Sequence, residues 1–331
     1  MDNLKIGFIG AGRMGKHHAL ILSEMKTGAA LAAVADVDVK LARQLSADYG
    51  ANAYRDYREM LDREALDAVF VLTPPDVRLE PIQMACERKI PVFCEKPPAS
   101  RLDEAHQIAD IFDTSGVINS VGFNYRWYKS VDRVRELLSG KAVACVQSIF
   151  MNNVALNPSQ PKWTFIQENS GGPILEQAIH SLDILRYLVG DIDYLSALGG
   201  NPVLSKSESF TIQDSHAISL YFTSSAVGVH LHSWVVNETV VQLRFFGVNF
   251  DLNLDLIPPS SIRGTMSGES VDFTPMKDDP FVTQIAGFVD AIEQKDQSII
   301  RSSYRDAVAT LAVTLAAIDS VSSPEAGNNE D

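Results

Sequence analysis

Short apolar runs alternate with amphipathic helical patterns over the first 123 residues of the chain. The apolar runs cover residues 4–9, 30–35, 68–72, 91–94 and 117–123. Helical patterns cover residues 14–25, 39–49, 77–88 and 102–115. Continuous apolar strands separated by helices are typical of a parallel sheet that is covered on both faces. The pattern therefore predicts a doubly wound α/β domain over residues 1–123.

After residue 123 the chain is dominated by long runs in which apolar and polar positions alternate. In one of them, Ile218, Leu220 and Phe222 occupy every second position. Such runs cover residues 143–152, 216–222, 227–236, 240–246 and 250–256. A period of two is typical of strands with two unlike faces, so residues 124–321 are predicted to form a second domain on an antiparallel or mixed sheet. Helical patterns lie at residues 130–138, 280–294 and 303–321, and residues 322–331 are expected to be a flexible tail.

The composition limits the classes of partner. The 331 residues include 28 basic and 42 acidic side chains, which gives a formal net charge of −14. This excess of acid argues against nucleic acid, and against an anionic membrane surface, as the main partner. The longest charge-free apolar segment near the C-terminus, residues 307–318, is shorter than the roughly 20 residues that span a bilayer.

The cysteines and the first residues give an expectation for the cellular compartment. Cys86, Cys94 and Cys145 show no CxxC spacing, which predicts reduced thiols and no disulfide framework. An apolar run begins soon after Met1, without the basic segment and separate apolar stretch of an export signal. These features predict a cytoplasmic protein.

The string Gly10-Ala11-Gly12-Arg13-Met14-Gly15 fits the G-x-G-x-x-G pattern between a strand and a helix. In a dinucleotide-binding loop, Gly10 permits the tight turn, Gly12 lets the backbone approach a pyrophosphate, and Gly15 allows close helix–strand packing. The helix N-terminus offers N–H groups to the phosphates, and Arg13 and Met14 are expected beside them. The alternative is a glycine-rich turn with a structural role alone.

Asp36 ends the second apolar run, 21 residues after Gly15. A carboxylate at this spacing accepts hydrogen bonds from both ribose hydroxyls of an adenosine and repels a 2′-phosphate. No Lys or Arg follows directly, because residues 37–39 are Val, Asp and Val. The spacing therefore favours NAD over NADP. In the alternative interpretation Asp36 only caps the next helix.

Thr73-Pro74-Pro75 follows the third apolar run and is expected at the carboxyl end of a strand, where this architecture binds ligands. The prolines would hold the loop rigid, with Thr73 and Pro74 against the cofactor, unless the segment is a simple turn.

Glu95 and Lys96 follow the fourth apolar run and are expected at the same edge of the sheet. A partly desolvated Lys96 would fix and polarise a substrate oxygen. Glu95 would orient the cofactor or pair with Lys96. From spacing alone, an ion pair at a surface strand end explains these two residues equally well.

A polar stripe lies on a largely apolar helix expected from Gly171 to about Val189. At roughly 100° per residue, one narrow sector holds Glu176, His180, Asp183 and Tyr187. Buried Glu, His and Asp side chains are costly unless paired, and such groups cluster at functional sites. His180 is the candidate acid–base group, with Glu176 bonded to its ring. A structural histidine is the alternative, and a Glu176–His180 metal site lacks a third ligand of obvious spacing, so no metal is predicted.

Taken together, these motifs resemble those of the Gfo/Idh/MocA oxidoreductases, the relatives of glucose–fructose oxidoreductase and inositol dehydrogenase. The resemblance covers nearly the whole chain and is carried by Gly10–Gly15, Thr73-Pro74, Glu95-Lys96-Pro97, Asn124-Tyr125-Arg126 and Gly171–Asp183. It implies a Rossmann domain that binds a nicotinamide cofactor, with Asn124 beside it. It also implies a C-terminal α/β domain whose large open, mostly antiparallel sheet forms the interfaces of a homodimer or homotetramer. The family lysine maps to Lys96 and the catalytic histidine to His180.

Two positions depart from the family pattern. Family members usually place Asp where Glu176 stands, and many carry His where Arg78 stands. Arg78 is expected to pair with an acidic neighbour or to help hold the cofactor. Family members often have aromatic residues near the nicotinamide, for which Trp163 and Tyr128 are the candidates, and Asp183 is expected to support the site or bind substrate.

The leading functional hypothesis is an NAD-dependent dehydrogenase of a sugar, polyol or related hydroxy compound. In it, His180 removes the hydroxyl proton, Lys96 holds the substrate oxygen, and Glu176 orients His180 or grips a neighbouring hydroxyl. The alternatives are a glycosidase or lyase that uses bound NAD without net redox change, and a non-catalytic NAD-binding sensor.

Overall fold

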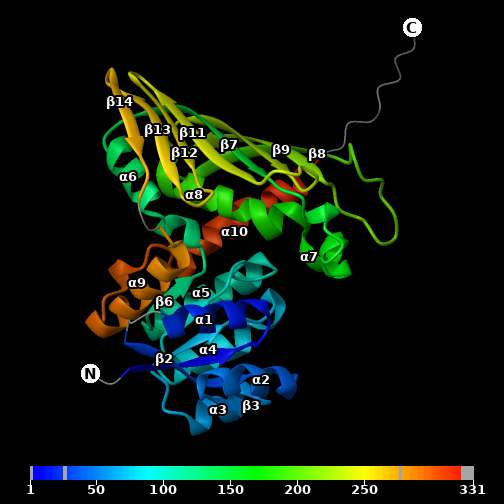
Figure 1. Cartoon of the computed structure of the whole chain (residues 1–331), viewed down its shortest axis with the longest axis vertical. Coiled ribbons are helices and arrows are strands. Elements are labelled where there is room, and N and C mark those ends of the chain that lie inside the picture. Colours follow the sequence, from blue (N-terminus) through cyan, green and yellow to red (C-terminus); the bar gives the residue numbers. More distant parts are fainter. Residues whose placement is uncertain (1–2, 25–27, 276–277, 322–331) are drawn as a thin grey trace. The chain divides into compact units, whose positions relative to one another are not determined.

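The computed structural model describes residues 3–24, 28–275 and 278–321, so the expected tail lies outside the described residues. The chain divides into two compact units. The first comprises Met1–Trp127 and Asp279–Leu311, and the second comprises Tyr128–Asp278 and Ala312–Asp331, with elements labelled in Figure 1. The sequence predicted a boundary at residue 123 between two contiguous domains. In the structure, Asp279–Leu311 also groups with the first unit.

The first unit is built on a six-stranded sheet in the order β3-β2-β1-β4-β5-β6. Every strand pair in it is parallel. The strands are β1 (Leu4–Ile9), β2 (Ala29–Ala35), β3 (Asn52–Tyr54), β4 (Ala68–Val71), β5 (Val92–Cys94) and β6 (Asn119–Val121). The strand order reverses between β1 and β4, which is the order of a dinucleotide-binding fold and confirms the doubly wound prediction.

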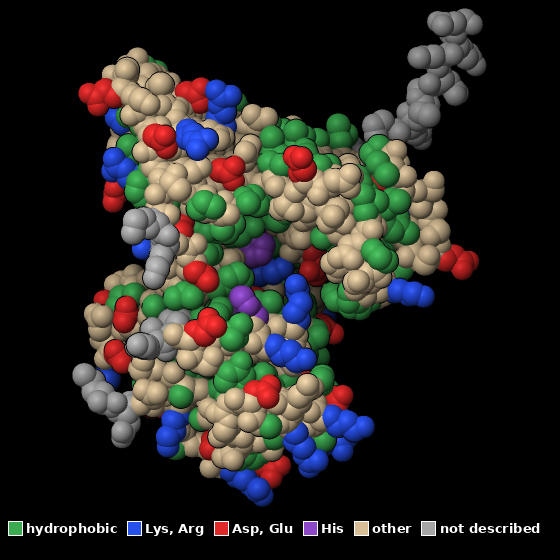
Figure 2. Space-filling view, in the orientation of Figure 1, with side chains coloured by type: hydrophobic (Ala, Val, Ile, Leu, Met, Phe, Trp, Pro, Cys, Tyr) green, Lys and Arg blue, Asp and Glu red, His purple; other side chains and the backbone are tan. Residues whose placement is uncertain are grey.

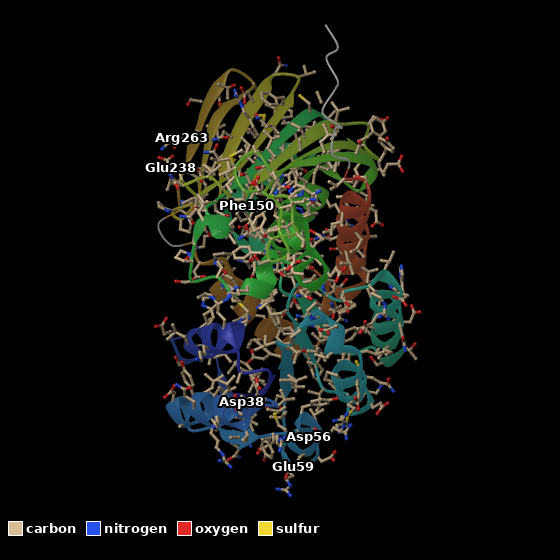
Figure 3. All side chains as sticks on the ribbon, turned by 90° about the vertical axis from the view of Figure 1, so that its right-hand side faces the viewer. Asp38, Asp56, Glu59, Phe150, Glu238 and Arg263 are labelled. Atoms are coloured by element: carbon tan, nitrogen blue, oxygen red, sulfur yellow. The ribbon has the colours of Figure 1, made fainter. Side chains whose placement is uncertain are left out.

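Helices lie between or after these strands, and two of them begin at aspartate caps. They are α1 (Arg13–Glu24), α2 (Val39–Tyr49), α3 (Tyr57–Arg63), η1 (Pro75–Val77), α4 (Leu79–Glu87), α5 (Leu102–Ser115) and η2 (Asn124–Trp127). Asp38 caps α2 by accepting from the N–H of Lys40, and Asp56 caps α3 through Arg58. Both aspartates are labelled in Figure 3. A carboxylate at an N-cap satisfies a backbone donor that the helix leaves unpaired.

The last part of the chain completes the core of the first unit. Helix α9 (Pro280–Gln294) and the turn η6 (Gln297–Ile299) precede α10 (Tyr304–Asp319), within which the division between the units falls. The ring of Phe288 on α9 lies 5.7 Å from that of Phe70 and 5.8 Å from that of Phe93, centroid to centroid. Aromatic rings at this separation pack favourably, so α9 is an integral part of the nucleotide-binding unit.

The second unit is built on an eight-stranded sheet in the order β14-β13-β12-β11-β7-β10-β9-β8. Its strands are β7 (Val143–Met151), β8 (Ile192–Gly200), β9 (Ser215–Phe222), β10 (Val227–Ser233), β11 (Val240–Gly247), β12 (Phe250–Asp255), β13 (Ser261–Met266) and β14 (Glu269–Phe273). Strands β7 and β10 pair in parallel and the other neighbours are antiparallel. The predicted mostly antiparallel sheet is therefore confirmed.

Helical segments accompany this sheet, and the sheet has two unlike faces. The segments are α6 (Lys129–Leu138), η3 (Val154–Leu156), η4 (Lys162–Phe165), α7 (Gln167–Ser170), the π-helical turn η5 (Ile174–Ala178) and α8 (Ile179–Val189). On β9, Ile218, Leu220 and Phe222 are buried, whereas Tyr221, which lies between Leu220 and Phe222, is exposed. This alternation is the period of two that a strand with two unlike faces shows.

The structure also shows how the charged side chains are distributed, whether a described helix could span a membrane, and the state of the cysteines. On the face shown in Figure 2, basic and acidic side chains are interspersed over both units. Over residues 3–24, 28–275 and 278–321, no helix is long and apolar enough to cross a membrane. Cys86, Cys94 and Cys145 form no disulfide, and burial raises the pKa of the Cys86 thiol to about 11.

Candidate functional site

A cavity of about 900 Å³ opens in the first unit at the carboxyl ends of β1, β2 and β4. Its walls include Gly10, Gly12, Asp36, Thr73 and Pro74. Open parallel sheets bind ligands outside the carboxyl ends of their strands, where the strand order reverses. The volume is within the roughly 300–1,000 Å³ typical of ligand pockets. Five of the predicted cofactor residues are therefore brought together at one cavity.

The glycine turn between β1 and α1 has the backbone that the sequence pattern predicts. Gly10 has φ +109°, and a Cβ built on it would lie 2.9 Å from the carbonyl carbon of Leu72. A Cβ on Gly15 would lie 2.6 Å from the carbonyl oxygen of Gly10, whereas a Cβ on Gly12 would meet nothing within 4 Å. Gly10 and Gly15 are thus required by the fold itself, and Gly12 leaves open space beside the cavity. Arg13, exposed, and Met14 open helix α1 after the turn.

The Asp36 carboxylate is bound to the glycine turn. Its Oδ2 accepts from the N–H of Ala11 at 2.8 Å, and its Oδ1 accepts from the N–H of Asp38 at 2.8 Å. The cap of α2 is Asp38, so capping does not explain Asp36. Each carboxylate oxygen has a second lone pair, so Asp36 can still accept from hydroxyl groups of a ligand in the cavity.

The Thr73 hydroxyl is buried at the cavity, and its Oγ1 has no hydrogen-bond partner in the part of the chain that the structure describes. Buried polar groups are nearly always hydrogen-bonded, so this hydroxyl is available to bind a ligand in the cavity. Pro74 precedes the turn η1 without contributing a side-chain cap. The turn, the carboxylate and the hydroxyl together fit the phosphates, ribose and polar groups of a dinucleotide.

Glu95 and Lys96 follow β5 in the same unit. The Glu95 side chain is buried, and Lys96 is half-buried. Glu95 Oε2 accepts from the backbone N–H of Lys96 at 3.1 Å, and Glu95 Oε1 lies 2.7 Å from Nε2 of His18 on α1. Burial acts to raise the pKa of the Glu95 carboxyl, but the hydrogen bond from His18 and neighbouring positive charges, including that of Lys96, hold the pKa below its ordinary value. The carboxylate therefore interacts with both the main chain and the charge of Lys96.

Arg78 donates its hydrogen bonds to main-chain carbonyl groups, and its charge helps to lower the pKa of the Glu95 carboxyl, after the larger effects of burial, which raises that pKa, and of His18. Its role in holding the cofactor stays a prediction. Arg78 is 2% exposed and donates to the carbonyl oxygen of Thr73 from Nε at 3.0 Å and from Nη2 at 2.6 Å. Its Nη1 donates to the carbonyl oxygens of Glu95 and Pro97. The fork of a guanidinium reaches several acceptors at once, so Arg78 ties the loop after β4 to the loop after β5.

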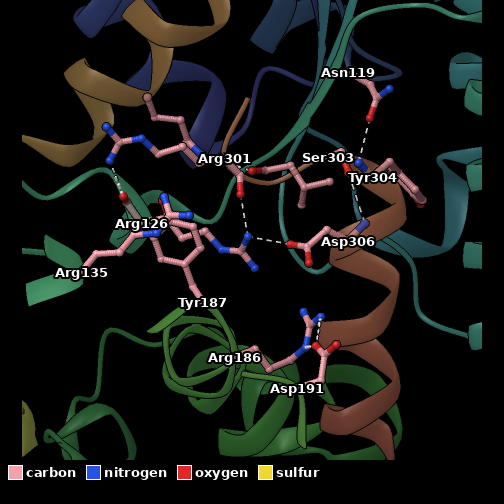
Figure 4. Close-up of polar contacts among 12 residues, drawn as sticks. Asn119, Arg126, Arg135, Arg186, Tyr187, Asp191, Arg301, Ser303, Tyr304 and Asp306 are labelled. Carbon is pink, nitrogen blue, oxygen red and sulfur yellow. Dashed lines mark hydrogen bonds and ion pairs between the residues drawn. The ribbon is translucent and has the colours of Figure 1, made fainter. Parts of the chain in front are cut away.

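The segment Asn124–Trp127 is separated from the end of β6 by two residues and is held by hydrogen bonds between Arg126 and Arg301. Nη1 of Arg126 donates to the carbonyl oxygen of Arg301 at 2.6 Å, and Nη1 of Arg301 donates to that of Arg126 at 2.7 Å. Arg126 also pairs with Asp306 at 2.6 Å, as Figure 4 shows. Asn124 is 4% exposed, so it lies in a buried turn.

The predicted polar helix of the second unit begins with a π-helical turn. Glu176 lies in η5 and His180 in α8, and both are half-buried. A π-helix bonds i to i+5 and has more residues per turn than an α-helix, so the count of 100° per residue does not hold across Glu176. Single π-helical turns often occur at functional sites. The place of Glu176 on the same side of the helix as His180 therefore stays a prediction.

Gln177, which the sequence pattern did not mark as a site residue, anchors this π-helical turn. Its Oε1 accepts from Nδ2 of Asn152 at 2.7 Å and from Nε1 of Trp234 at 2.6 Å. Asn152 directly follows β7 and Trp234 directly follows β10, which pair in parallel. The anchor therefore fixes the segment of Glu176 to the ends of two neighbouring strands.

The other predicted residues of the second unit have different environments. Asp183 is 0% exposed and Tyr128 is 5% exposed, whereas Trp163 is 50% exposed. The Tyr187 hydroxyl accepts from Arg135 at 2.8 Å, and the Arg135 guanidinium lies 4.6 Å from the centre of the Tyr187 ring (Figure 4). Tyr187 therefore has a partner on α6. In the described ranges, no group of three His, Cys, Asp or Glu side chains is arranged to hold a metal ion.

Sequence comparisons identify relatives of both parts of the chain. Residues 4–123 match the family described as "Oxidoreductase family, NAD-binding Rossmann fold", and residues 131–249 match the GFO/IDH/MocA C-terminal domain. The uncharacterized oxidoreductase YrbE of Bacillus subtilis is 26% identical over 292 residues, 87% of this chain and 83% of YrbE. Myo-inositol 2-dehydrogenase of Thermotoga maritima is 28% identical over 228 residues, 68% of this chain and 67% of that protein.

A solved structure shares the fold over nearly the whole chain. Levoglucosan dehydrogenase in complex with NADH and levoglucosan aligns with a TM-score of 0.85 at 19% identity. The alignment covers 96% of this chain and 97% of that one. At this identity the similarity shows that the two chains share a fold.

Proposed function

Since the chain belongs to the Gfo/Idh/MocA family of oxidoreductases, we propose that it is an NAD-dependent dehydrogenase of a sugar, polyol or inositol. The observation that carries the proposal is the strand-end cavity, whose walls combine the glycine turn with the Asp36 carboxylate and the buried Thr73 hydroxyl. Each of these groups is complementary to a part of a nicotinamide dinucleotide.

The preference for NAD over NADP rests on charge. Asp36 lies on the cavity and would repel a 2′-phosphate. Arg58, which also lines the cavity, is bound to Glu80 at 2.9 Å through Nε and also pairs with Asp56. Arg55 also lines the cavity. If NADP proves to bind, Arg55 is the side chain to substitute.

In the proposed reaction, the glycine turn and Asp36 would hold a nicotinamide cofactor, which would supply the hydride chemistry. Lys96 holds the substrate oxygen and limits the charge that develops on it, and His180 takes the hydroxyl proton. Glu176 orients His180 or binds a neighbouring hydroxyl, and Asp183 supports it. Lys96 belongs to the first unit and His180 to the second, so the pair stays a prediction.

The substrate class is proposed from chemistry and from relatives. In the proposed reaction the substrate carries an alcohol whose oxygen both Lys96 and His180 reach. One relative is named for myo-inositol, and one structural neighbour holds levoglucosan, a sugar derivative. Cyclic polyols and sugars are therefore the first compounds to test.

The test is a panel of inositols, sugars, linear polyols and hydroxy acids, each with NAD and separately with NADP. The expected result is growth of the reduced-nicotinamide absorbance with a cyclic polyol or sugar and NAD. Cleavage of a glycoside without a change in that absorbance would identify a glycosidase that uses NAD transiently. Binding of NAD without turnover of any compound in the panel would favour a sensor.

We also propose that the chain forms a homodimer or homotetramer through its large sheet. Four apolar or aromatic side chains on β8, β9 and β10 are strongly exposed: Tyr194 at 68%, Leu198 at 51%, Tyr221 at 42% and Val227 at 51%. Exposed apolar patches mark interaction surfaces. Light scattering coupled to size-exclusion chromatography should give a mass of two or four chains, and Tyr221→Lys should reduce it.

A further inference from the structure

The carboxylate of Glu95 is buried at the base of the segment that carries Lys96. Its side chain is 7% exposed, and it accepts the Lys96 N–H at 3.1 Å through Oε2. Its other oxygen, Oε1, lies 2.7 Å from Nε2 of His18. One carboxylate therefore connects helix α1 to the main chain of Lys96.

His18 is enclosed by aromatic rings. The side chain is 0% exposed, and its ring centre lies 5.6 Å from that of Phe70, 5.3 Å from that of Phe93 and 6.3 Å from that of Phe281. These rings fix the imidazole and offer it no polar alternative to Glu95. Its Nδ1 has no hydrogen-bond partner within the described residues, so the contact with Glu95 is the one that orients the ring.

The backbone around Glu95 leaves space for this arrangement. A Cβ built on Gly122, just after β6, would lie 3.0 Å from Oε2 and 3.2 Å from Cδ of Glu95. Gly122 itself donates its N–H to the carbonyl oxygen of Cys94 at 2.8 Å. The carboxylate is therefore packed directly against the main chain of the neighbouring strand end, and a side chain at position 122 would displace it.

The electrostatics keep Glu95 charged. Burial acts to raise the pKa of its carboxyl, but the hydrogen bond from His18 and the nearby positive charges bring that pKa below its ordinary value. A buried carboxylate without such partners is costly and moves toward any available cation or donor. Loss of the His18 donor would thus release Glu95 from its position under the Lys96 N–H.

We propose that His18 is a positioning residue for Lys96, which it holds in place through the buried Glu95 carboxylate. The effect on catalysis rests on the proposed dehydrogenase function, whereas the effect on the Lys96 main chain does not. Positioning of a group that contacts substrate affects turnover more than cofactor affinity, because small displacements from the reactive geometry are costly.

The test uses the full chain and hydrogen exchange at the Lys96 amide. Pro97 and Pro98 have no amide hydrogen, so Lys96 is the last residue before these two prolines whose amide hydrogen can exchange. His18→Leu removes the donor, and the Lys96 amide is expected to exchange about 10-fold faster. His18→Gln places an amide nitrogen at the reach of Nε2 and is expected to restore exchange to within about threefold of the wild-type rate.

Matched variants separate positioning from a loss of stability. His17→Leu alters the adjacent histidine, which packs on Phe281 at 4.6 Å, and should leave the Lys96 amide unchanged. Glu95→Gln removes the charge with little change of shape and should accelerate exchange as His18→Leu does. The double variant should be no faster than either single variant, because both remove one interaction.

Turnover provides the second readout. With a substrate from the panel, His18→Leu should lower kcat about 10-fold and change the NADH dissociation constant less than about twofold. Unchanged Lys96 exchange in folded His18→Leu, or equally fast exchange in His18→Gln, would overturn the positioning role. If the wild type turns over no compound, the exchange result still decides this inference while the proposed function fails.

Discussion

Replacement of Arg78 tests how strongly one buried guanidinium holds the two loops beside the cavity. Arg78 donates to the carbonyl oxygens of Thr73, Glu95 and Pro97 and is 2% exposed. Arg78→Met keeps a long apolar stem and removes every donor. Three buried carbonyl groups then lose their charged partner.

The magnitude follows from the number of acceptors. A hydrogen bond to a charged group contributes about 1.5–3 kcal/mol, and the lower end applies here because removal of a buried charge also removes its desolvation cost. Three acceptors give a loss of about 4–5 kcal/mol in the free energy of unfolding. Arg78→Lys keeps the charge but cannot fork between two loops, so a loss of about 2 kcal/mol is expected.

The assay is urea unfolding followed by circular dichroism. With a slope of about 3 kcal/mol per molar urea, Arg78→Met should shift the midpoint of the first unit's transition by about 1.5 M. Arg88→Met, which removes an exposed partner of Asp62, is the control and should shift it by less than about 0.3 M. An Arg78→Met midpoint as close to wild type as that of the control would refute the assignment of Arg78 as the link between the loops.

Four further changes test the cavity and the second unit. Asp36→Ala should weaken NAD binding by about 10-fold in calorimetric titrations and NADP binding less, and an equal loss for both cofactors would contradict the ribose contact. Gly15→Ala should lower the melting temperature by several degrees, about 1–3 kcal/mol, because its Cβ would meet a carbonyl oxygen at 2.6 Å. Gly12→Ala should melt as wild type does and yet bind NAD more weakly. Burial lowers the pKa of His216 to about 4 and that of His230 to about 3, so both are neutral in the fold. Their contribution to stability is complete above about pH 6.5 and is lost as the pH falls toward 4 and then 3. His230→Asn should reduce the pH dependence of the urea unfolding midpoint between pH 6.5 and 4. An unchanged pH dependence would show that His230 does not contribute to it.

Much of the fold could be predicted because buried elements carry strong periodic patterns. The expected helices at residues 39–49, 102–115 and 280–294 coincide with α2, α5 and α9. The hydrophobic pattern did not predict β3, β8, β13 and β14, nor helix α3. Strands β3, β8 and β14 lie at sheet edges, and β13 is the neighbour of an edge strand. Edge strands bury few side chains, so their apolar pattern is weak.

The candidate site was predictable where its chemistry is local. The glycine turn and Asp36 lie within one strand–helix–strand unit, and their spacing along the chain fixes their positions in the fold. His18 was not predictable, because its partner Glu95 lies 77 residues away and only tertiary packing joins them. The π-helical turn at Glu176 was missed because its anchor, Asn152, lies 25 residues from Gln177.

Helix α9 has a consequence for how the protein is made. Its Phe288 completes a core whose other aromatic rings, Phe70 and Phe93, are synthesised about two hundred residues earlier. A nascent chain that has left the ribosome only as far as residue 127 has all six strands of the parallel sheet but leaves these rings uncovered. Such exposed apolar surface favours aggregation and chaperone binding during translation. The nucleotide-binding half is therefore expected to mature last, after the chain that interrupts it has emerged.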